Sequence, residues 1–235
     1  MKIKKKKEPT QKCYDCPIRA KSIFAQVDAT TCEAIDQVRQ TQAFESEQEL
    51  PLKSGAQAGF YCLQAGHARL FFKNEKKTNT VRICGPGDFL GYGDWYMADS
   101  HGAVALSSGI ACYFDRLKFE KEMRQNHELS ESVIKGLCKI INLKDERISG
   151  LENHSVRNRI SVLLHNLVKK FGVHTADGVL IDVSVDRRTL SELSGTVIES
   201  FARIITQMES EKIIKREGRK IIITDKEKLL RSTYE

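Results

Sequence analysis

Residues 186–209, DRRTLSELSGTVIESFARIITQME, constrain the fold of this chain more than any other stretch. Asp186 is suited to begin a helix, because its carboxylate accepts hydrogen bonds from the free amides of a first helical turn. Leu190 and Leu193 would form the inward face of that short helix. Gly195 then permits a tight turn, since glycine adopts backbone conformations that other residues avoid. The stretch therefore predicts a short helix followed by a sharp turn.

A second, longer helix is predicted after the turn, with Thr196 as its cap. Its buried side is marked by apolar residues at helical spacing, namely Val197, Phe201, Ile204, Ile205 and Met208. The outer side of its first two turns is left to Ile198, Glu199, Ala202 and Arg203. A short helix, a glycine turn and a longer helix that is polar on the outside at its start are typical of a helix-turn-helix.

Residues 211–225, EKIIKREGRKIIITD, follow directly and predict a strand, a turn and a second strand. Basic residues gather around the tip of this hairpin: Lys215, Arg216, Arg219 and Lys220. Such side chains suit the phosphate backbone of a nucleic acid. The alternative is a small helical subdomain with a solvated charged face. The cap, the turn, the helix and the basic hairpin occur in order, which favours a winged helix-turn-helix.

The part of the chain before residue 116 consists of short apolar runs separated by glycine. Residues 60–64, 67–73, 80–84 and 103–115 carry aromatic and β-branched residues between turn signals. This pattern predicts a small antiparallel barrel or roll of short strands. Its corners are expected at glycines, namely Gly55, Gly66, Gly85 and Gly87.

From about residue 117 the apolar residues recur in steps of three and four, which predicts a long amphipathic helix. One use of such a stripe is a coiled-coil seam with a second copy of the chain, and the other is packing on its own domain. The expected dimer interface consists of Val133, Leu137, Ile140, Ile141, Lys144, Ile148 and Leu151. In a parallel dimer Lys144 would face its own copy and oppose association, unless its ammonium group extends to water.

Together these patterns predict an α+β protein in four parts. A basic, cysteine-containing N-terminal segment covers residues 1–22, and a β-roll sensor domain covers residues 23–125. A dimerisation helix spans residues 126–151, and a winged helix-turn-helix domain spans residues 152–235.

The formal net charge of +7 lies mostly in residues 1–12, which hold six lysines and one glutamate. This arm is expected to be solvated, with a weak electrostatic contact to DNA as the alternative. No apolar run reaches the roughly 18 residues of a membrane helix, and no apolar stretch follows the basic start as in a secretory signal. We therefore expect a cytoplasmic protein without a membrane partner.

The chain as a whole resembles the Crp/Fnr family of bacterial transcription regulators. The resemblance rests on the N-terminal cysteines, the glycine-punctuated roll with GPGDFLG, the long helix and the segment RRTLSELSGTVIESFARII. It implies a cyclic-nucleotide-binding-like sensor, a homodimer, double-stranded DNA as ligand and RNA polymerase as protein partner. It also implies a palindromic DNA site with TTGA-like half-sites one helical turn apart.

The resemblance implies base-reading roles for Glu199 and Arg203, because Arg pairs with guanine O6 and N7 and Glu accepts from a cytosine amine. Ile198 stands where the nucleotide-sensing branch has an Arg, and an apolar residue there is the habit of the oxygen-sensing branch. Arg187 matches a phosphate-contacting position. The full expected DNA-binding set is Arg187, Thr196, Ile198, Glu199, Ser200, Ala202, Arg203, Lys215, Arg216, Arg219 and Lys220.

Nucleotide-binding members of the family hold the ribose with a Glu and the cyclic phosphate with an Arg-Ser/Thr pair. Tyr92 stands at the place of that Glu, and Gly102 and Ala103 stand at the place of the pair. Asp94 and His101 nearby are expected to be loop residues. Because the phosphate would lack a cationic partner, cyclic AMP is not expected to be the ligand.

The oxygen-sensing branch holds an iron–sulfur cluster with three N-terminal cysteines and one at the end of the roll, and soft thiolates suit iron. Cys13 and Cys16 match the first two N-terminal places and Cys112 matches the distant one, whereas Ser22 occupies the third N-terminal place. Cys32 is a further candidate. Three interpretations stay open. The cysteines bind an iron–sulfur cluster, they bind another metal or act as a thiol switch, or they match the family's positions without binding a cofactor.

Catalysis is not expected. The segment CYDC resembles a thioredoxin-like motif, but no βαβ unit surrounds it, and GPGDFLG lacks the lysine of a phosphate loop. A second alternative is a ligand- or redox-sensing scaffold without DNA-binding activity. Glu199, Arg203 and the basic hairpin argue against it.

Overall fold

The computed structural model describes residues 12–52, 58–73, 78–91 and 101–233. The chain divides into two compact units, one of residues Met1–Thr78 and Ile83–Ile140 and the other of Asn79–Arg82 and Ile141–Glu235. The boundary between Ile140 and Ile141 falls inside the long helix α3 (His127–Asn153).

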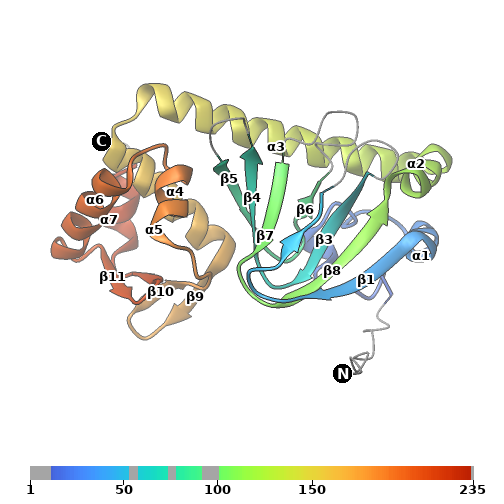
Figure 1. Cartoon of the computed structure of the whole chain (residues 1–235), viewed down its shortest axis with the longest axis horizontal. Helices are drawn as coiled ribbons and strands as arrows, with labels where there is room; N and C mark the ends of the chain where they lie inside the picture. The colour runs from blue at the N-terminus through green and yellow to red at the C-terminus, as the bar shows by residue number, and fades with distance from the viewer. Residues whose placement is uncertain (1–11, 53–57, 74–77, 92–100, 234–235) are drawn as a thin grey trace. The chain divides into compact units, whose positions relative to one another are not determined.

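The N-terminal unit is built on two four-stranded sheets whose strands pair antiparallel (Figure 1). The first sheet has the order β1 (Arg39–Phe44), β8 (Gly109–Asp115), β3 (Gly59–Ala65) and β6 (Phe89–Leu90). The second has the order β2 (Glu49–Leu50), β7 (His101–Ala105), β4 (Ala68–Lys73) and β5 (Thr78–Cys84). This is the antiparallel roll that the glycine-punctuated sequence predicts.

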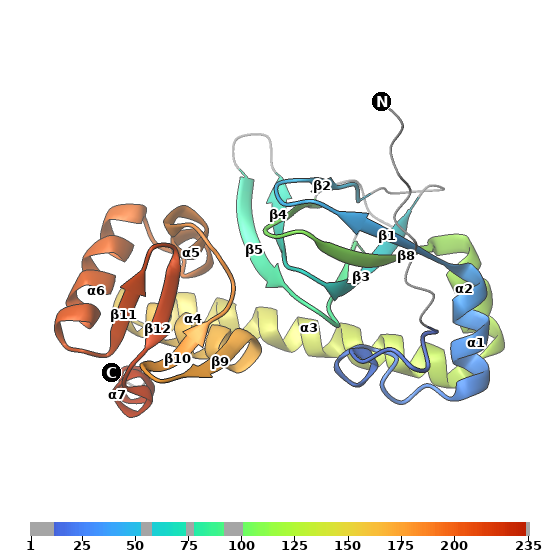
Figure 2. The ribbon, with the colours of Figure 1, turned by 90° about the horizontal axis from the view of Figure 1, so that it is seen from below.

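Three helical segments flank the first sheet: η1 (Arg19–Lys21), α1 (Ala29–Val38) and α2 (Arg116–Gln125). Helices α1 and α2 lie side by side in both views (Figures 1 and 2). Beneath them Phe60 stacks on Phe114 with ring centroids 4.9 Å apart and meets Phe119 edge-on at 4.7 Å. Phe24 joins the same aromatic cluster, so the core anchors the N-terminal segment to the sheet.

The roll confirms the strands expected at 60–64, 67–73 and 80–84, whereas the stretch 103–115 is two strands, β7 and β8. Strands β1, β2 and β6 and helix α1 were not predicted. Gly66 and Gly87 have positive φ values, 83° and 92°, as expected at corners. Gly85 is absent from the positive-φ glycines of the described residues, and Gly55 lies outside that part of the chain.

The helical region after residue 117 is two helices, α2 and the long α3 (His127–Asn153). Asn126 separates them, because its side-chain Oδ1 accepts a hydrogen bond from the Leu129 amide at 2.9 Å and caps the start of α3. Its Nδ2 donates to Thr31 Oγ1 in α1. The observed helix matches the expected dimerisation helix, 126–151, to within two residues at each end.

The C-terminal unit contains α4 (Val156–Phe171), α5 (Arg187–Leu193), α6 (Ile198–Ser210) and α7 (Lys226–Arg231). Its sheet has the order β11 (Ile214–Glu217), β12 (Lys220–Ile223), β10 (Gly178–Ile181) and β9 (Gly172–Thr175), as Figure 2 shows. Strands β9 and β10 pair antiparallel. Within the described residues, no helix combines the length and the apolar character that a transmembrane span needs.

Candidate functional site

Helix α5 begins as the sequence predicts. The Asp186 carboxylate accepts a hydrogen bond from the Thr189 amide at 2.7 Å. The turn after α5 contains Gly195 with φ 63°, a left-handed conformation that favours glycine. Arg159 of α4 holds this turn from outside, since its Nε donates to the Ser194 carbonyl at 3.0 Å and its Nη2 donates to the Gly195 carbonyl at 3.1 Å. Sequence patterns gave no sign of this brace.

The start of α6 differs from the prediction. Val197, not Thr196, is the N-cap residue, and among the described residues no side chain caps the first turn. Val197 is 61% exposed, so it does not belong to the buried side as expected. Phe201, Ile204, Ile205 and Met208 are buried as the helical spacing predicts. The cap prediction for Thr196 was wrong because the chain stays extended for one residue longer, to Val197.

The first two turns of α6 present a mixed face to solvent. Ile198, Glu199 and Arg203 are exposed, while Ser200 and Ala202 are half-buried. Among the described residues, neither Glu199 nor Arg203 has an ion-pair or hydrogen-bond partner for its side chain. Glu199 also lies in the first turn, where a negative charge is favourable to the helix dipole. One acceptor and one forked donor, a helical turn apart, therefore face water unpaired.

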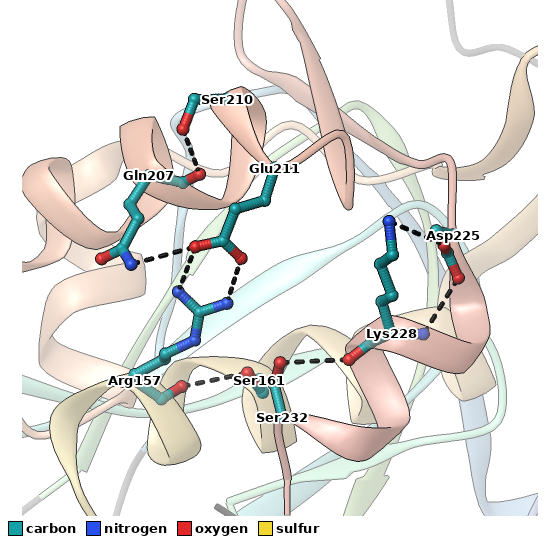
Figure 3. A network of polar contacts seen from close by, with 8 residues as sticks. All are labelled: Arg157, Ser161, Gln207, Ser210, Glu211, Asp225, Lys228 and Ser232. Atoms are coloured by element: carbon teal, nitrogen blue, oxygen red, sulfur yellow. Dashed lines mark hydrogen bonds and ion pairs between the residues drawn. The ribbon is translucent and has the colours of Figure 1, made fainter.

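The C-terminal end of α6 is fixed by the polar network in Figure 3. Arg157 of α4 donates to both carboxylate oxygens of Glu211, with Nη1 at 3.1 Å from Oε1. Gln207 Nε2 donates to the same carboxylate at 2.9 Å. The hydrogen bonds from Arg157 lower the pKa of Glu211 below its ordinary value. A two-point contact of this kind sets the direction of α6 on α4.

The basic hairpin is largely paired with carboxylates. Lys215 Nζ lies 2.8 Å from Asp177 and 2.9 Å from Glu217, and these partners raise its pKa, the hydrogen bond to Asp177 most of all. Lys220 Nζ lies 2.9 Å from Asp182.

Arg216, at the other edge of the hairpin, donates to Glu209 of α6. Of the four basic residues, only Arg219 lacks an ion-pair partner among the described residues. The wing therefore presents less free positive charge than its sequence suggests.

Comparison with known proteins agrees with this geometry. Residues 158–232 match the family model of a Crp-like helix-turn-helix domain. The transcriptional activator protein FnrL of Cereibacter sphaeroides is 22% identical over 93% of this chain and 90% of its own. The anaerobic regulatory protein of Bacillus subtilis is 24% identical over 74% of this chain and 75% of its own.

The fold is also that of a solved structure, FixK2 from Bradyrhizobium japonicum. The TM-score is 0.70 at 15% identity, over 83% of this chain and 96% of that one. Residues 158–232 are thus a Crp-like helix-turn-helix domain, and the chain as a whole is similar to Crp/Fnr regulators. Its roll is thus the cyclic-nucleotide-binding-like fold of that family, and its C-terminal unit is the helix-turn-helix part.

Gly102 and Ala103, which the resemblance matches to the phosphate-binding pair, lie in strand β7. Ala103 is fully buried, and a Cβ added at Gly102 would come within 2.4 Å of the Phe71 ring. Neither residue supplies a cation. Tyr92 and Asp94 lie outside the described residues. The prediction that cyclic AMP is not the ligand therefore still rests on the residue types at positions 102 and 103.

The cysteines of the N-terminal unit fall into different surroundings. Cys13 and Cys112 are buried in one core cluster, and Cys16 is half-buried one turn after Cys13, with its amide donating to the Cys13 carbonyl. Arg39 Nη1 donates to Cys112 Sγ at 3.6 Å, and Asp36 accepts from the Cys13 amide at 3.1 and 3.0 Å. Among the described residues, no three His, Cys, Asp or Glu side chains are placed to hold a single metal ion.

Proposed function

We propose that this protein is a homodimeric, sequence-specific DNA-binding transcription regulator. The observation that carries this proposal is the unpaired, exposed pair Glu199 and Arg203 on the first two turns of α6. An Arg with a free fork reads guanine O6 and N7, a Glu accepts from a cytosine amine, and Ile198 beside them offers an apolar contact to a thymine methyl. These three contacts fit TTGA-like half-sites.

The surrounding polar groups suit the phosphate backbone. Arg187 is exposed at the first position of α5, and Thr196 and Ser200 flank the start of α6. Contacts of this kind position a protein on the duplex without reading sequence. RNA polymerase is the proposed protein partner and the cytoplasm the proposed location. The curated relatives are named as regulatory proteins, which fits a role without catalysis.

The proposed function is tested by fluorescence anisotropy with a duplex that carries two TTGA half-sites about 10 base pairs apart. We expect much tighter binding than to a duplex of the same composition with both half-sites scrambled. Each mismatched base pair should cost about 1–3 kcal/mol. Equal affinity for the two duplexes, in protein kept reduced and anaerobic and in protein exposed to air, would favour the scaffold alternative.

The proposed dimer uses the exposed face of α3. Ile134, Leu137, Ile141, Ile148 and Leu151 are exposed, and with Lys144 they recur in steps of three, four, three, four and three. This is the a/d repeat of a two-stranded coiled coil. Val133 and Ile140, expected on the seam, are half-buried, and Val133 packs on the core of its own unit. Ile134, 57% exposed, takes their place in the proposed interface.

A prediction about the wing follows from its ion pairs. Arg219→Ala should lower the slope of log affinity against log salt by about one, because the variant no longer neutralises a DNA phosphate at that position. Lys215→Ala should change the slope less, because its ammonium group is already shared between Asp177 and Glu217. Salt titrations of both variants on the palindrome measure this. A larger effect of Lys215→Ala would show that the wing pairs open on DNA.

A second prediction concerns the nucleotide. Cyclic AMP should produce no saturable rise in the thermal unfolding temperature, since Gly102 and Ala103 offer its phosphate no positive charge. A thermal-shift titration with cyclic AMP, and with sodium phosphate at matched ionic strength as control, measures this. Saturable stabilisation by cyclic AMP alone would overturn the prediction.

The sensor is proposed to be the N-terminal unit, with Cys13, Cys16 and Cys112 holding an iron–sulfur cluster. Supporting this, the backbone brings Cys13 and Cys16 together in one turn, and Cys13 and Cys112 share one core cluster. Such a cluster, when bound, would supply sensitivity to oxygen or nitric oxide. The signal would then alter the pairing of the two α3 helices and hence the spacing of the two recognition helices.

A further inference from the structure

Cys62 is a buried strand cysteine that lies beside two of the expected cluster ligands, Cys13 and Cys112. It lies on β3 directly opposite Cys112 of β8 in the antiparallel register. Directly opposite residues have Cα atoms about 4.5–5.5 Å apart, and their side chains leave the sheet on the same face. Cys62 is 4% exposed and belongs to the same core cluster as Cys13 and Cys112.

The packing gives the same neighbourhood. Cys13, Cys62 and Cys112 belong to one core cluster, and Cys16 is half-buried one turn after Cys13. The N-terminal turn, β3 and β8 therefore each bring a thiol to this cluster. Arg39, bonded to Cys112 Sγ, adds a positive charge beside them.

The other candidates for a fourth ligand are occupied elsewhere. The Ser22 hydroxyl donates to the Arg19 carbonyl at 2.8 Å and accepts from the Phe24 amide at 3.1 Å. It thus stabilises the turn after η1. Cys32 belongs to the same core cluster, but its thiol donates to the Val27 carbonyl at 3.9 Å.

The donor set suits an iron–sulfur cluster, because four cysteine thiolates are the usual ligands of such clusters. Zinc also takes four thiolates, so the sulfide content distinguishes a cluster from a single ion.

We propose that Cys62 is the fourth thiolate ligand of an iron–sulfur cluster, together with Cys13, Cys16 and Cys112, and that it supplies the ligand that Ser22 does not. This rests on the cluster-holding role proposed above for the N-terminal unit. It moves one ligand from the N-terminal loop to the sheet, so that β3 and β8 supply two ligands from adjacent strands.

The test uses full-length protein, purified without oxygen or reconstituted with ferrous iron and sulfide. Bound iron, zinc and acid-labile sulfide are measured with the visible spectrum. Cys62→Ala is compared with Cys13→Ala and with Cys84→Ala. Cys84 is the matched control, because it is a buried strand cysteine in the other core cluster of the roll. Thermal unfolding of each variant without iron shows whether it folds.

We expect wild type and Cys84→Ala to bind iron and sulfide, and Cys62→Ala to lose both, as Cys13→Ala does. Full iron and sulfide content in Cys62→Ala would overturn the assignment. A wild-type protein that holds zinc without sulfide, or no metal after reconstitution, would overturn it as well. If Cys62→Ala fails to fold, Cys62→Ser replaces it and is judged by the same contents. Binding of the TTGA duplex is measured separately, so failure here is distinct from failure of the DNA-binding function.

Discussion

Ile141→Glu is expected to turn the dimer into a monomer. Ile141 is 55% exposed at the centre of the a/d repeat of α3. The variant would remove about 1.5–3 kcal/mol of apolar burial from each copy and place two carboxylates in the seam. Because both copies are affected, the dimer dissociation constant should rise roughly a thousandfold or more. Sedimentation equilibrium over a range of protein concentrations measures it.

Asn142→Glu is the matched control for that variant. It adds the same carboxylate one residue further along α3, where the side chain is exposed and off the a/d repeat. This control should remain dimeric, with unchanged affinity for the palindrome. The monomeric Ile141→Glu should bind the palindrome no better than a single half-site. Should Ile141→Glu stay dimeric at low micromolar concentration, α3 is not the interface.

Arg203→Ala is expected to abolish discrimination at one base pair of each half-site. A bidentate Arg–guanine contact contributes about 1–3 kcal/mol, and the palindrome has two of them. Affinity for the TTGA palindrome should therefore fall by about 30-fold or more, whereas binding to unrelated DNA changes little. The measured quantity is the ratio of affinities for the palindrome and for a duplex with the guanine replaced by adenine in both half-sites.

Arg203→Lys is the informative companion, because it keeps the charge and removes the planar fork. It should retain most of the non-specific affinity and still lose the guanine preference. If Arg203→Ala kept the wild-type affinity ratio, the recognition role of this residue would be wrong, even though the protein could still bind DNA through Glu199 and the wing.

The helix-turn-helix could be predicted from sequence because its signals are local. Asp186 caps the first turn of its own helix, and Gly195 adopts a positive φ that depends on its own residue type. The buried residues of α6 recur with a period of 3.6 residues. Thr196 failed as a cap because the choice between neighbouring positions depends on one backbone angle that the sequence does not specify. The hydrogen bonds from Arg159 to Ser194 and Gly195 could not be predicted, because these residues lie 35 and 36 positions after Arg159 in the sequence.

The seam of α3 shows a different limit. Val133 and Ile134 are adjacent, and both fit a stripe of apolar residues, so spacing does not decide which faces outward. The structure decides it through tertiary packing, because Val133 contacts the core of the N-terminal unit and Ile134 does not. The position of Cys62 opposite Cys112 has a related cause: strand register sets it, and the pattern of one strand does not specify its register.

The paired charges of the wing have a consequence for how the protein finds its site. Genomic DNA offers an enormous number of wrong sites, and free lysines attract all of them equally. By holding Lys215, Arg216 and Lys220 against their own carboxylates, the domain lowers its attraction to every sequence at once. Base contacts from α6 then account for a larger share of the affinity. We therefore expect the wing to raise selectivity through its paired charges, by leaving fewer copies of the protein bound to irrelevant DNA.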